Sequence, residues 1–236
     1  MIQFYAPDIL LNPELPESES MHCSRVLRMK NGDEIFVTDG KGSRYRCLIL
    51  NSHTSHTSLS VISQEKLEAE KNYYLTLAVA PTKNSDRMEW MVEKAVEIGV
   101  DRIVLLKCER SERKYQKTER LKKIMIAAMK QSLSLFLPEI TELTDYKDFI
   151  FSCSKDSQKF FGYCSKDFPL KDFAKECKAG GEVIVMIGPE GDFTFEEVDK
   201  AIKYNFIPVT FGNKRLRTET AGVYATCAVN VINQLL

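Results

Sequence analysis

The chain has 236 residues, of which 44% are hydrophobic and 28% charged, and its formal net charge is zero. This composition fits a globular protein with one large or two modest domains. No apolar run approaches the roughly 20 residues that a membrane span needs, and the first residues lack the basic and long apolar regions of a signal peptide. The seven scattered cysteines form no C-x-x-C pair, and the three histidines lie near the start. We therefore expect no metal site and no disulfide framework, and free thiols fit a reducing cytoplasm.

Residues 1–70 are predicted to form a small barrel-like β module. Strands are expected at 34–38, 44–49 and 59–63, and Asp39-Gly40-Lys41-Gly42 is a strong hairpin turn. One or two helical turns are expected at 22–28. The charged stretch 64–71 is taken as the boundary of the module.

From residue 73 the pattern changes to alternating strands and helices, which indicates a mostly parallel sheet covered on both faces. Strands are predicted at 73–80, 103–106, 160–163, 183–187 and 206–211. A helix capped by Asn84 or Ser85 should end at Gly99, since Met88, Met91, Val92, Ala95 and Val96 have helical spacing. Another helix should cover 118–134, with Leu121, Ile124, Met125 and Ala128 inward and Lys122, Lys123 and Lys130 more exposed.

Two glycine-bearing loops are the most informative segments. The first, 187–193, reads Ile-Gly-Pro-Glu-Gly-Asp-Phe, follows an apolar strand and precedes a helix-like run at 194–198. The second, 211–221, reads Phe-Gly-Asn-Lys-Arg-Leu-Arg-Thr-Glu-Thr-Ala and also follows an apolar strand. Open α/β sheets bind ligands at the carboxyl ends of their strands. We therefore expect both loops to line one small-molecule pocket. The second loop lacks the spacing of a phosphate-binding P-loop.

The last predicted helix, 220–236, has almost no polar face. A helix that is apolar all round is buried all round. Packing on its own sheet and on a second subunit would explain this, as would burial within one subunit.

Charge is unevenly distributed. Residues 1–20 contain four acidic and no basic residues, 22–46 contain six basic and three acidic residues, and 107–123 contain eight basic and three acidic residues. Lys214, Arg215 and Arg217 form a further cluster. If these segments share a face, they suit phosphate groups; solvated helix faces would explain them equally well.

The two loops, 188–193 and 216–221, resemble the signature pair of the RsmE family, the 16S ribosomal RNA uracil-N3 methyltransferases of the SPOUT superfamily. The resemblance covers nearly the whole chain. It includes His22-x-x-Arg25-Val26-Leu27-Arg28 with Gly32, the stretch from Lys83 to Gly99, Glu109-Arg110-Ser111, Gln131-Ser132 and Pro138-Glu139-Ile140. Rival readings are a SPOUT enzyme that methylates ribose 2′-OH or guanine N1, and a non-catalytic RNA-binding protein.

The resemblance implies a PUA-like RNA-binding β-barrel at 1–70 and, at 73–236, a SPOUT methyltransferase domain with a C-terminal trefoil knot. It further implies S-adenosylmethionine as cofactor, 16S rRNA or the assembled small subunit as partner, and a homodimer through the C-terminal helix. The residues expected to bind the cofactor are Ile187, Gly188, Pro189, Glu190, Gly191, Phe211, Gly212, Leu216, Thr218, Thr220 and Ala221.

Methylation of uracil N3 requires loss of its proton, and negative charge then spreads onto O2 and O4. No histidine lies near the loops, so Glu190 and Glu219 are the candidate bases, and Arg217 is the candidate for stabilising the developing anion or for binding an RNA phosphate. Glu190 could equally organise its loop, and Arg217 could instead form an ion pair between subunits. Arg25 and Arg28 of the barrel, with Lys83, Arg110 and Arg113, are the expected RNA contacts, although each could be an ordinary surface charge.

The chain departs from the family pattern at three positions. Asp192 replaces a usual glycine, and its carboxylate could face the cofactor's ribose or solvent. Ser134 and Phe136 stand where the family usually has arginines, so an RNA contact is absent or supplied elsewhere. Lys130 replaces a usual acid and could compensate.

Overall fold

The computed structural model describes residues 2–113, 117–164 and 168–235. It divides into two compact units, one comprising the chain up to Glu70 together with Ile126–Leu137, the other comprising Lys71–Met125 and the chain from Pro138 on. Each unit has its own buried core.

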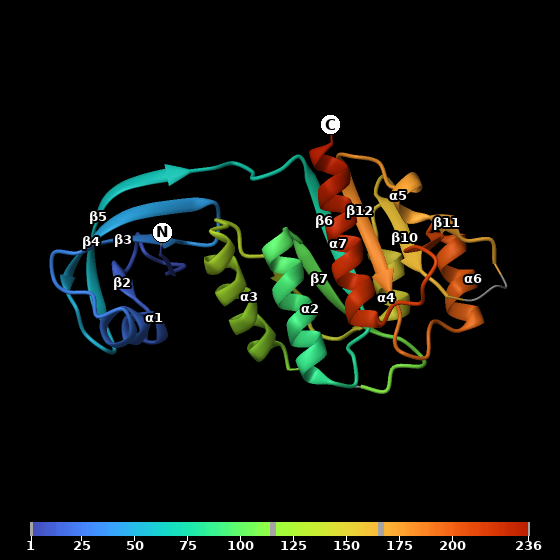
Figure 1. Cartoon of the computed structure of the whole chain (residues 1–236), viewed down its shortest axis with the longest axis horizontal. Helices are drawn as coiled ribbons and strands as arrows, with labels where there is room; N and C mark the ends of the chain where they lie inside the picture. The colour runs from blue at the N-terminus through green and yellow to red at the C-terminus, as the bar shows by residue number, and fades with distance from the viewer. Residues whose placement is uncertain (1, 114–116, 165–167, 236) are drawn as a thin grey trace. The chain divides into compact units, whose positions relative to one another are not determined.

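The first unit is built on a five-stranded, nearly closed sheet (blue and cyan in Figure 1). Its order is β1-β3-β4-β5-β2, with bounds β1 Gln3–Tyr5, β2 Glu14–Leu15, β3 Glu34–Thr38, β4 Ser43–Asn51 and β5 Thr57–Lys66. Helix α1, Glu17–Met21, continues into a π-helical segment, His22–Val26. Alternate strand residues such as Ile35, Val37 and Tyr45 fill the core. The predicted barrel-like β module is confirmed.

The hairpin between β3 and β4 needs both of its glycines. Gly40 has a φ of 71° and Gly42 a φ of 98°, in the left-handed region that glycine adopts most readily. The Asp39 carboxylate accepts hydrogen bonds from the backbone N–H of Lys41 (2.7 Å) and Ser43 (3.1 Å). A side chain at Gly42 would lie 2.6 Å from the Phe136 ring.

Lys130 is not the exposed residue that we expected. It lies in helix α3, Thr118–Ser132, and its Nζ is 2.5 Å from Glu19 Oε1; the Lys130 and Glu19 side chains are only 17% and 8% exposed. The prediction was wrong because helical periodicity indicates which face of the helix a residue occupies. It does not indicate a partner 111 residues away in the sequence. An ion pair this far from water serves the packing of the module, since a buried charge needs its partner.

The second unit contains a parallel sheet in the order β11-β13-β10-β12-β6-β7-β8, with β9 paired to β7. The strands are β6 Tyr73–Val79, β7 Arg102–Lys107, β8 Glu139–Ile140, β9 Thr144–Asp145, β10 Gln158–Gly162, β11 Lys171–Asp172, β12 Gly181–Ile187 and β13 Ile207–Thr210. The remaining helices are α2 Ser85–Ile98, α4 Tyr146–Ser152, α5 Phe173–Glu176, α6 Phe195–Lys203 and α7 Thr218–Gln234.

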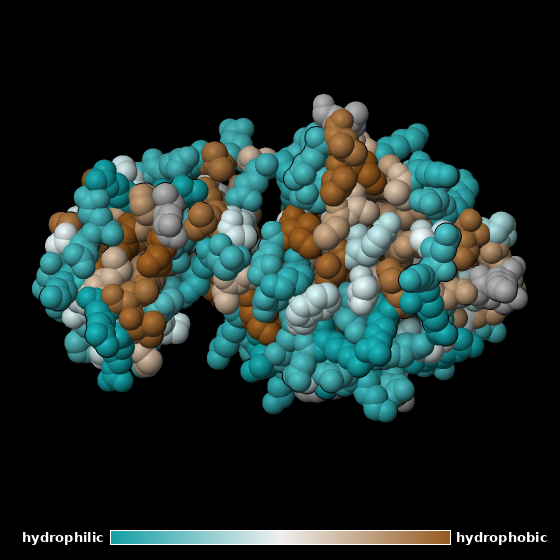
Figure 2. Space-filling view, viewed as in Figure 1, coloured by the Kyte–Doolittle hydropathy of each residue, from teal (hydrophilic) through white to brown (hydrophobic). Residues whose placement is uncertain are grey.

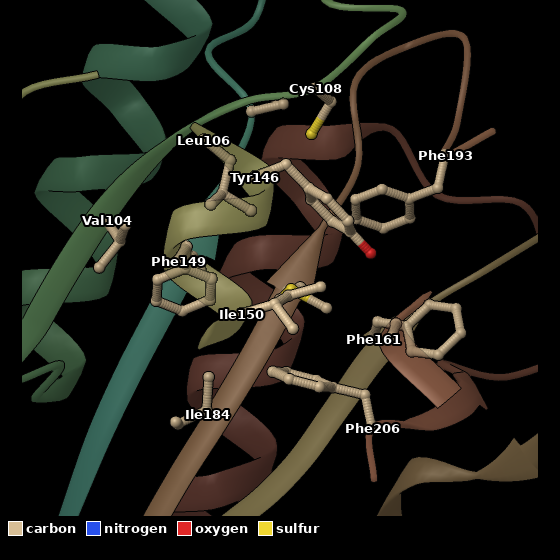
Figure 3. Close-up of a cluster of buried hydrophobic side chains, with 14 of the residues drawn as sticks. Val104, Leu106, Cys108, Tyr146, Phe149, Ile150, Phe161, Ile184, Phe193 and Phe206 are labelled. Atoms are coloured by element: carbon tan, nitrogen blue, oxygen red, sulfur yellow. The ribbon is translucent and has the colours of Figure 1, made fainter. Parts of the chain in front are cut away.

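Helices cover both faces of this sheet, as predicted. On one face α2 packs against α7, and α7 lies on β6 and β12 (Figure 1). On the other face α4 and α6 enclose an apolar cluster with Ile184 and Met186 of β12 (Figure 3). Val183 and Val185 alternate with these residues and are equally buried. The trefoil threading implied by the resemblance stays a prediction.

Helix α2 has the predicted limits. The Asn84 side chain accepts a hydrogen bond from the Asp86 N–H at 2.8 Å, and Gly99, with a φ of 111°, ends the helix. The five predicted inward residues, Met88, Met91, Val92, Ala95 and Val96, are buried.

Helix α6 begins with a capping box. Thr194 Oγ1 accepts a hydrogen bond from the Glu197 N–H at 3.2 Å, and Glu197 Oε2 accepts one from the Thr194 N–H at 2.8 Å. Replacing Thr194 by alanine should lower the free energy of unfolding by about 1 kcal/mol, because one helix N–H loses its acceptor. Chemical denaturation measures this change. Thr194→Ser keeps the acceptor and serves as the control; an equal loss in both variants would contradict this role for the cap.

No helix in the described ranges is long and apolar enough to cross a membrane. Within the same residues, no group of three or more His, Cys, Asp or Glu side chains could hold a metal ion. All seven cysteines are free thiols.

Candidate functional site

A cavity of about 410 Å³ lies where three neighbouring strands of the second unit end. Strand β10 lies between β13 and β12 and pairs in parallel with both. The carboxyl ends of these strands therefore meet at one edge, where open α/β sheets bind ligands. The cavity is lined by Arg87, Gly162, Tyr163, Cys164, Ile187, Gly188, Pro189, Glu190, Asp192, Val209, Thr210, Phe211, Lys214, Arg215, Leu216, Arg217, Thr218, Glu219 and Ala221.

Both predicted loops line this one cavity. Most residues predicted to bind a cofactor are in its wall, namely Ile187, Gly188, Pro189, Glu190, Phe211, Leu216, Thr218 and Ala221. Gly191, Gly212 and Thr220 are not among the lining residues. Gly212 instead has a backbone role, because its φ of 106° is one that other residues rarely adopt.

The sequence interpretation missed a third loop. It treated the two loops as neighbours because their strands follow one another in the sequence, whereas β10 separates β12 from β13. The loop after β10 adds Gly162, Tyr163 and Cys164 to the wall, and helix α2 adds Arg87. The signal for Gly162 was present: it is a glycine at the end of an apolar strand, as Gly188 is.

Gly162 makes room for an aromatic ring. A Cβ at this position would lie 2.6 Å from Cε2 of Phe211, closer than real contacts allow. The Phe211 ring is itself held between Phe173 and Tyr224, with ring centroids 5.4 and 5.5 Å away. A small residue at 162 therefore fixes the position of one cavity wall.

The loop 188–193 is fixed by its aromatic end. The Phe193 ring is 1% exposed and packs beside Tyr146, at 5.6 Å between ring centroids (Figure 3). Burial raises the pKa of the Tyr146 hydroxyl, which donates a 2.6 Å hydrogen bond to the Glu197 carbonyl. Phe193 thus ties the loop to the apolar cluster between the sheet and helices α4 and α6.

Hydrogen bonds from three residues also hold this loop in place. Arg110 Nη1 donates to the Gly191 carbonyl at 2.9 Å and to the Phe193 carbonyl at 3.4 Å. The Lys83 N–H donates to Glu190 Oε1 at 3.0 Å. Thr218 Oγ1 of helix α7 donates to the Gly188 carbonyl at 3.1 Å, which joins the two signature loops. These hydrogen bonds hold the loop against α7 and the neighbouring loops.

Asp192 adopts a φ of 60°, which explains how a usual glycine position can carry aspartate, since aspartate enters the left-handed region more readily than most residues. Its carboxylate accepts hydrogen bonds from the N–H groups of Cys164 (3.1 Å) and Phe193 (2.9 Å). Burial raises the pKa of this carboxyl, although the two hydrogen bonds and the charges of Arg215 and Arg110 oppose the shift. Asp192 thus joins the first loop to the loop after β10.

Comparison with known proteins gives this cavity its context. Residues 69–230 match the family model of an RNA methyltransferase domain, and 15–56 match an RNA methyltransferase PUA domain. A ribosomal RNA small subunit methyltransferase E from Aquifex aeolicus is 31% identical over 214 residues, covering 89% of this chain and 90% of that protein.

The chain belongs to the ribosomal RNA small subunit methyltransferase E family.

Two solved structures extend the likeness to the fold. A probable rRNA methyltransferase from Porphyromonas gingivalis has a TM-score of 0.95 and 40% identity, covering 100% of this chain and 99% of that one. A ribosomal RNA small subunit methyltransferase E from Neisseria gonorrhoeae bound to S-adenosyl methionine has a TM-score of 0.86 and 26% identity, covering 99% of this chain and 98% of that one. Membership of the methyltransferase E family confirms the resemblance and the expectation of an RNA methyltransferase.

The three residues of this chain that we expect to be catalytic differ in their surroundings. Glu219, in the first turn of α7, is 7% exposed, and its Oε1 lies 3.7 Å from Nε of Arg87. Arg217 stands at the N-terminal boundary of the same helix and is exposed. Glu190 is exposed and its carboxylate accepts the Lys83 N–H, which is the loop-organising alternative. All three line the cavity.

The residues expected to contact RNA lie in both units. Arg25 and Arg28 are exposed in the first unit, and Arg28 has a φ of 55°. In the second unit, Lys83 pairs with Glu112 at 2.9 Å, a contact that raises the pKa of the Lys83 amine. Arg110 is committed to two loop carbonyls, and Arg113, which is half-buried, has partners of its own. Of the five residues, Arg25 and Arg28 therefore stay the candidates for RNA contact in the first unit.

The departures from the family pattern at Ser134 and Phe136 have structural roles. Ser134 Oγ donates to Glu70 Oε2 at 2.9 Å, and its carbonyl accepts a hydrogen bond from Gln3 Nε2 at 2.9 Å. The Phe136 ring covers the Gly42 turn. Neither residue carries a positive charge, so residues outside this segment would have to supply a phosphate contact.

Proposed function

We propose that the chain methylates N3 of a uracil in small-subunit (16S) ribosomal RNA, with S-adenosylmethionine as the donor. Residues 1–70 would serve as the RNA-binding module and 73–236 as the methyltransferase domain. The observation that carries the proposal is the single cavity enclosed by both signature loops in a chain of this family. A reducing cytoplasm, where ribosomal RNA and free thiols coexist, is the proposed location.

The residues of the cavity fit S-adenosylmethionine. Ile187, Leu216 and Val209 offer apolar surface for an adenine ring, and the loop backbones offer N–H and C=O groups for its edge. Glu190, Glu219 and Asp192 provide carboxylates that suit a ribose hydroxyl, an ammonium group and a sulfonium. When bound, the sulfonium supplies an electrophilic methyl group with its own leaving group.

The protein must then remove the N3 proton and stabilise the resulting charge. Glu219 is the proposed proton acceptor, because it is largely shielded from water and held in place by Arg87. Arg217, two residues earlier, is proposed to stabilise negative charge on O2 or O4. N3 lies on the Watson–Crick edge of uracil, so the target base must be unpaired or flipped out to react.

The decisive experiment uses small ribosomal subunits from a strain that lacks this protein. Incubation with labelled S-adenosylmethionine, followed by nuclease digestion and mass spectrometry, should reveal 3-methyluridine in 16S rRNA. Methylation of a ribose 2′-OH or of guanine N1 would instead identify a different SPOUT specificity. Calorimetry that finds no binding of S-adenosylmethionine would leave only a non-catalytic RNA-binding role. Protein-free 16S rRNA, tested in parallel, distinguishes free RNA from the assembled subunit as substrate.

The barrel arginines should make RNA affinity depend on salt. Arg25→Gln and Arg28→Gln should each reduce the slope of log affinity against log salt by about 0.7–0.9, the value for one lost phosphate contact. Fluorescence anisotropy at several salt concentrations measures the slope. Arg46→Gln is the matched control in the same module, since Arg46 is paired with Glu34 at 2.6 Å. An unchanged slope in both test variants would remove these arginines from the RNA contact.

A homodimer through helix α7 is part of the proposal. Its buried face includes Ala221, Ala225 and Val229, whereas Tyr224, Val231 and Leu235 form a second stripe and are 40%, 50% and 78% exposed. Figure 2 shows apolar surface at the C-terminal end of this helix. A stripe of this kind on an otherwise packed helix suits a two-fold interface.

Disruption of this stripe should produce monomers. In sedimentation velocity, the wild type should have twice the chain mass of 27.0 kDa, and Val231→Glu should shift it to the monomer mass. Ile202→Glu, at a 39% exposed position on α6, is the control. A monomeric wild type would refute the dimer.

A further inference from the structure

A second hollow of about 370 Å³ adjoins the proposed cofactor cavity. The two share Tyr163, Cys164, Asp192 and Arg215 in their walls, so a ligand in the second hollow would lie beside the cofactor. The remaining wall residues of the second hollow are Arg110, Phe193 and Phe195. Of the residues proposed to hold S-adenosylmethionine, only Asp192 also lines the second hollow.

A row of three aromatic rings borders the hollow. The ring centroids of Tyr163 and Phe168 are 6.1 Å apart, and those of Phe168 and Phe195 are 5.7 Å apart. Phe195 is 63% exposed although it begins helix α6, whose core-facing residues are Val198 and Ala201. The fold therefore gains little from Phe195, and an exposed ring at the edge of a hollow is available to stack on a flat ligand.

Two arginines face the same hollow. The Arg110 guanidinium is fixed by the carbonyls of Gly191 and Phe193. Arg215 is exposed, and over residues 2–113, 117–164 and 168–235 the structure gives it no hydrogen bond and no ion pair within 4.0 Å. Its charge acts on the carboxyl group of Asp192, which lines both spaces. The hollow thus combines stacking surface, an exposed cation and a hydrogen-bond acceptor.

We propose that this hollow holds an unpaired nucleotide of the substrate RNA, with its base stacked on the Phe195 ring and its phosphate on Arg215. Stacking on aromatic rings and phosphate contacts to arginine are the two means by which proteins hold single-stranded RNA. Asp192 can still accept a hydrogen bond from the base edge, because a carboxylate has about four acceptor sites, two accept from N–H groups, and a cofactor hydroxyl would take one more. The inference rests on the proposed function, since it assumes an RNA substrate beside the methyl donor.

The nucleotide is either the target or one of its neighbours in the strand, and crosslinking distinguishes these. Once the methylated uridine has been mapped, short RNAs carry 5-iodouridine at that position or at each flanking position. Irradiation of the full-length protein with these RNAs, followed by peptide mass spectrometry, should give a crosslink to Tyr163, Phe168 or Phe195 from one of the positions. That position identifies the occupant. Absence of any crosslink to the three rings would overturn the proposal.

Substitutions provide the second test. Phe195→Ala should weaken RNA affinity by about 5- to 150-fold, the range for loss of one stacked base, and leave S-adenosylmethionine affinity within twofold. Phe151→Ala is the matched control, because Phe151 is 54% exposed and stacks on Tyr204 at 5.1 Å, outside both hollows. Arg215→Gln should lower the salt slope by about 0.7, and Arg215→Lys should restore it.

The outcomes separate this inference from the proposed function. If the wild type neither binds S-adenosylmethionine nor methylates small subunits, the proposed function fails. If the wild type does both and Phe195→Ala binds RNA as well as Phe151→Ala does, only the nucleotide site fails. An equal loss of S-adenosylmethionine and RNA affinity in Phe195→Ala would also overturn it, because the ring would then have a structural role.

Discussion

Replacing Gly162 by valine is expected to lower the affinity for S-adenosylmethionine by about 100-fold, or about 2.7 kcal/mol. Gly162 ends strand β10 and has no left-handed φ, so valine suits the backbone. The effect should therefore come from the side chain, whose Cβ would lie 2.6 Å from the Phe211 ring. Phe211 cannot retreat easily, because Phe173 and Tyr224 hold it. The displaced ring should enter the cavity that the cofactor needs.

Isothermal titration calorimetry measures the affinity, and circular dichroism establishes that the variant folds. The double variant Gly162→Val, Phe211→Ala supplies the control. If the clash is the cause, valine should cost much less affinity in the Phe211→Ala background than alone, because the obstructing ring is gone. A Gly162→Val protein that binds within threefold of the wild type would show that the cavity is not the cofactor site.

Local sequence patterns were sufficient to predict the long helices. Helix α2 was predicted from five apolar residues at helical spacing, a cap and a glycine stop, all of which lie between Asn84 and Gly99. Short elements such as α4, with seven residues, were not predicted, because two turns give too few positions for a periodic signal. Strand β5 extends through Lys66, into the charged stretch taken as the boundary, since its exposed end has no need of apolar residues.

Strand order could not be obtained from local patterns. The strand at 160–163 was recognised, but its place between β12 and β13 depends on pairings across many residues of chain, which periodicity does not report. As a result Gly162, Tyr163 and Cys164 were missing from the predicted site. Arg87 was missed for the same reason: only the packing of α2 against α7 brings it to Glu219. The loop that begins at Gly188 could be predicted, because a glycine directly after an apolar run marks the end of a strand.

The other large effect is expected at the two residues that open helix α7. Arg217→Gln should lower the single-turnover rate of methyl transfer by about 10²- to 10³-fold, the usual cost of losing one group that stabilises a developing anion. Glu219→Gln should lower it by about 10²- to 10⁴-fold, because glutamine cannot accept the N3 proton. Rapid quenching with saturating S-adenosylmethionine and enzyme in excess over RNA measures the chemical step.

Glu190→Gln is the matched control, since glutamine keeps an oxygen for the Lys83 N–H and the loop stays in place. Its rate should stay within tenfold of the wild type.

A change of substrate then distinguishes a proton acceptor from a residue that only positions Arg87. Fluorine at C5 makes the N3 proton of uridine more acidic. Methylation of RNA with 5-fluorouridine at the target therefore depends less on the side chain that accepts this proton. The deficit of Glu219→Gln should shrink on that RNA, whereas the deficit of Arg217→Gln should persist. If Glu190→Gln is the slower glutamate variant and alone recovers with fluorouridine, the proton acceptor is Glu190, and the burial of Glu219 beside Arg87 serves the packing of α7.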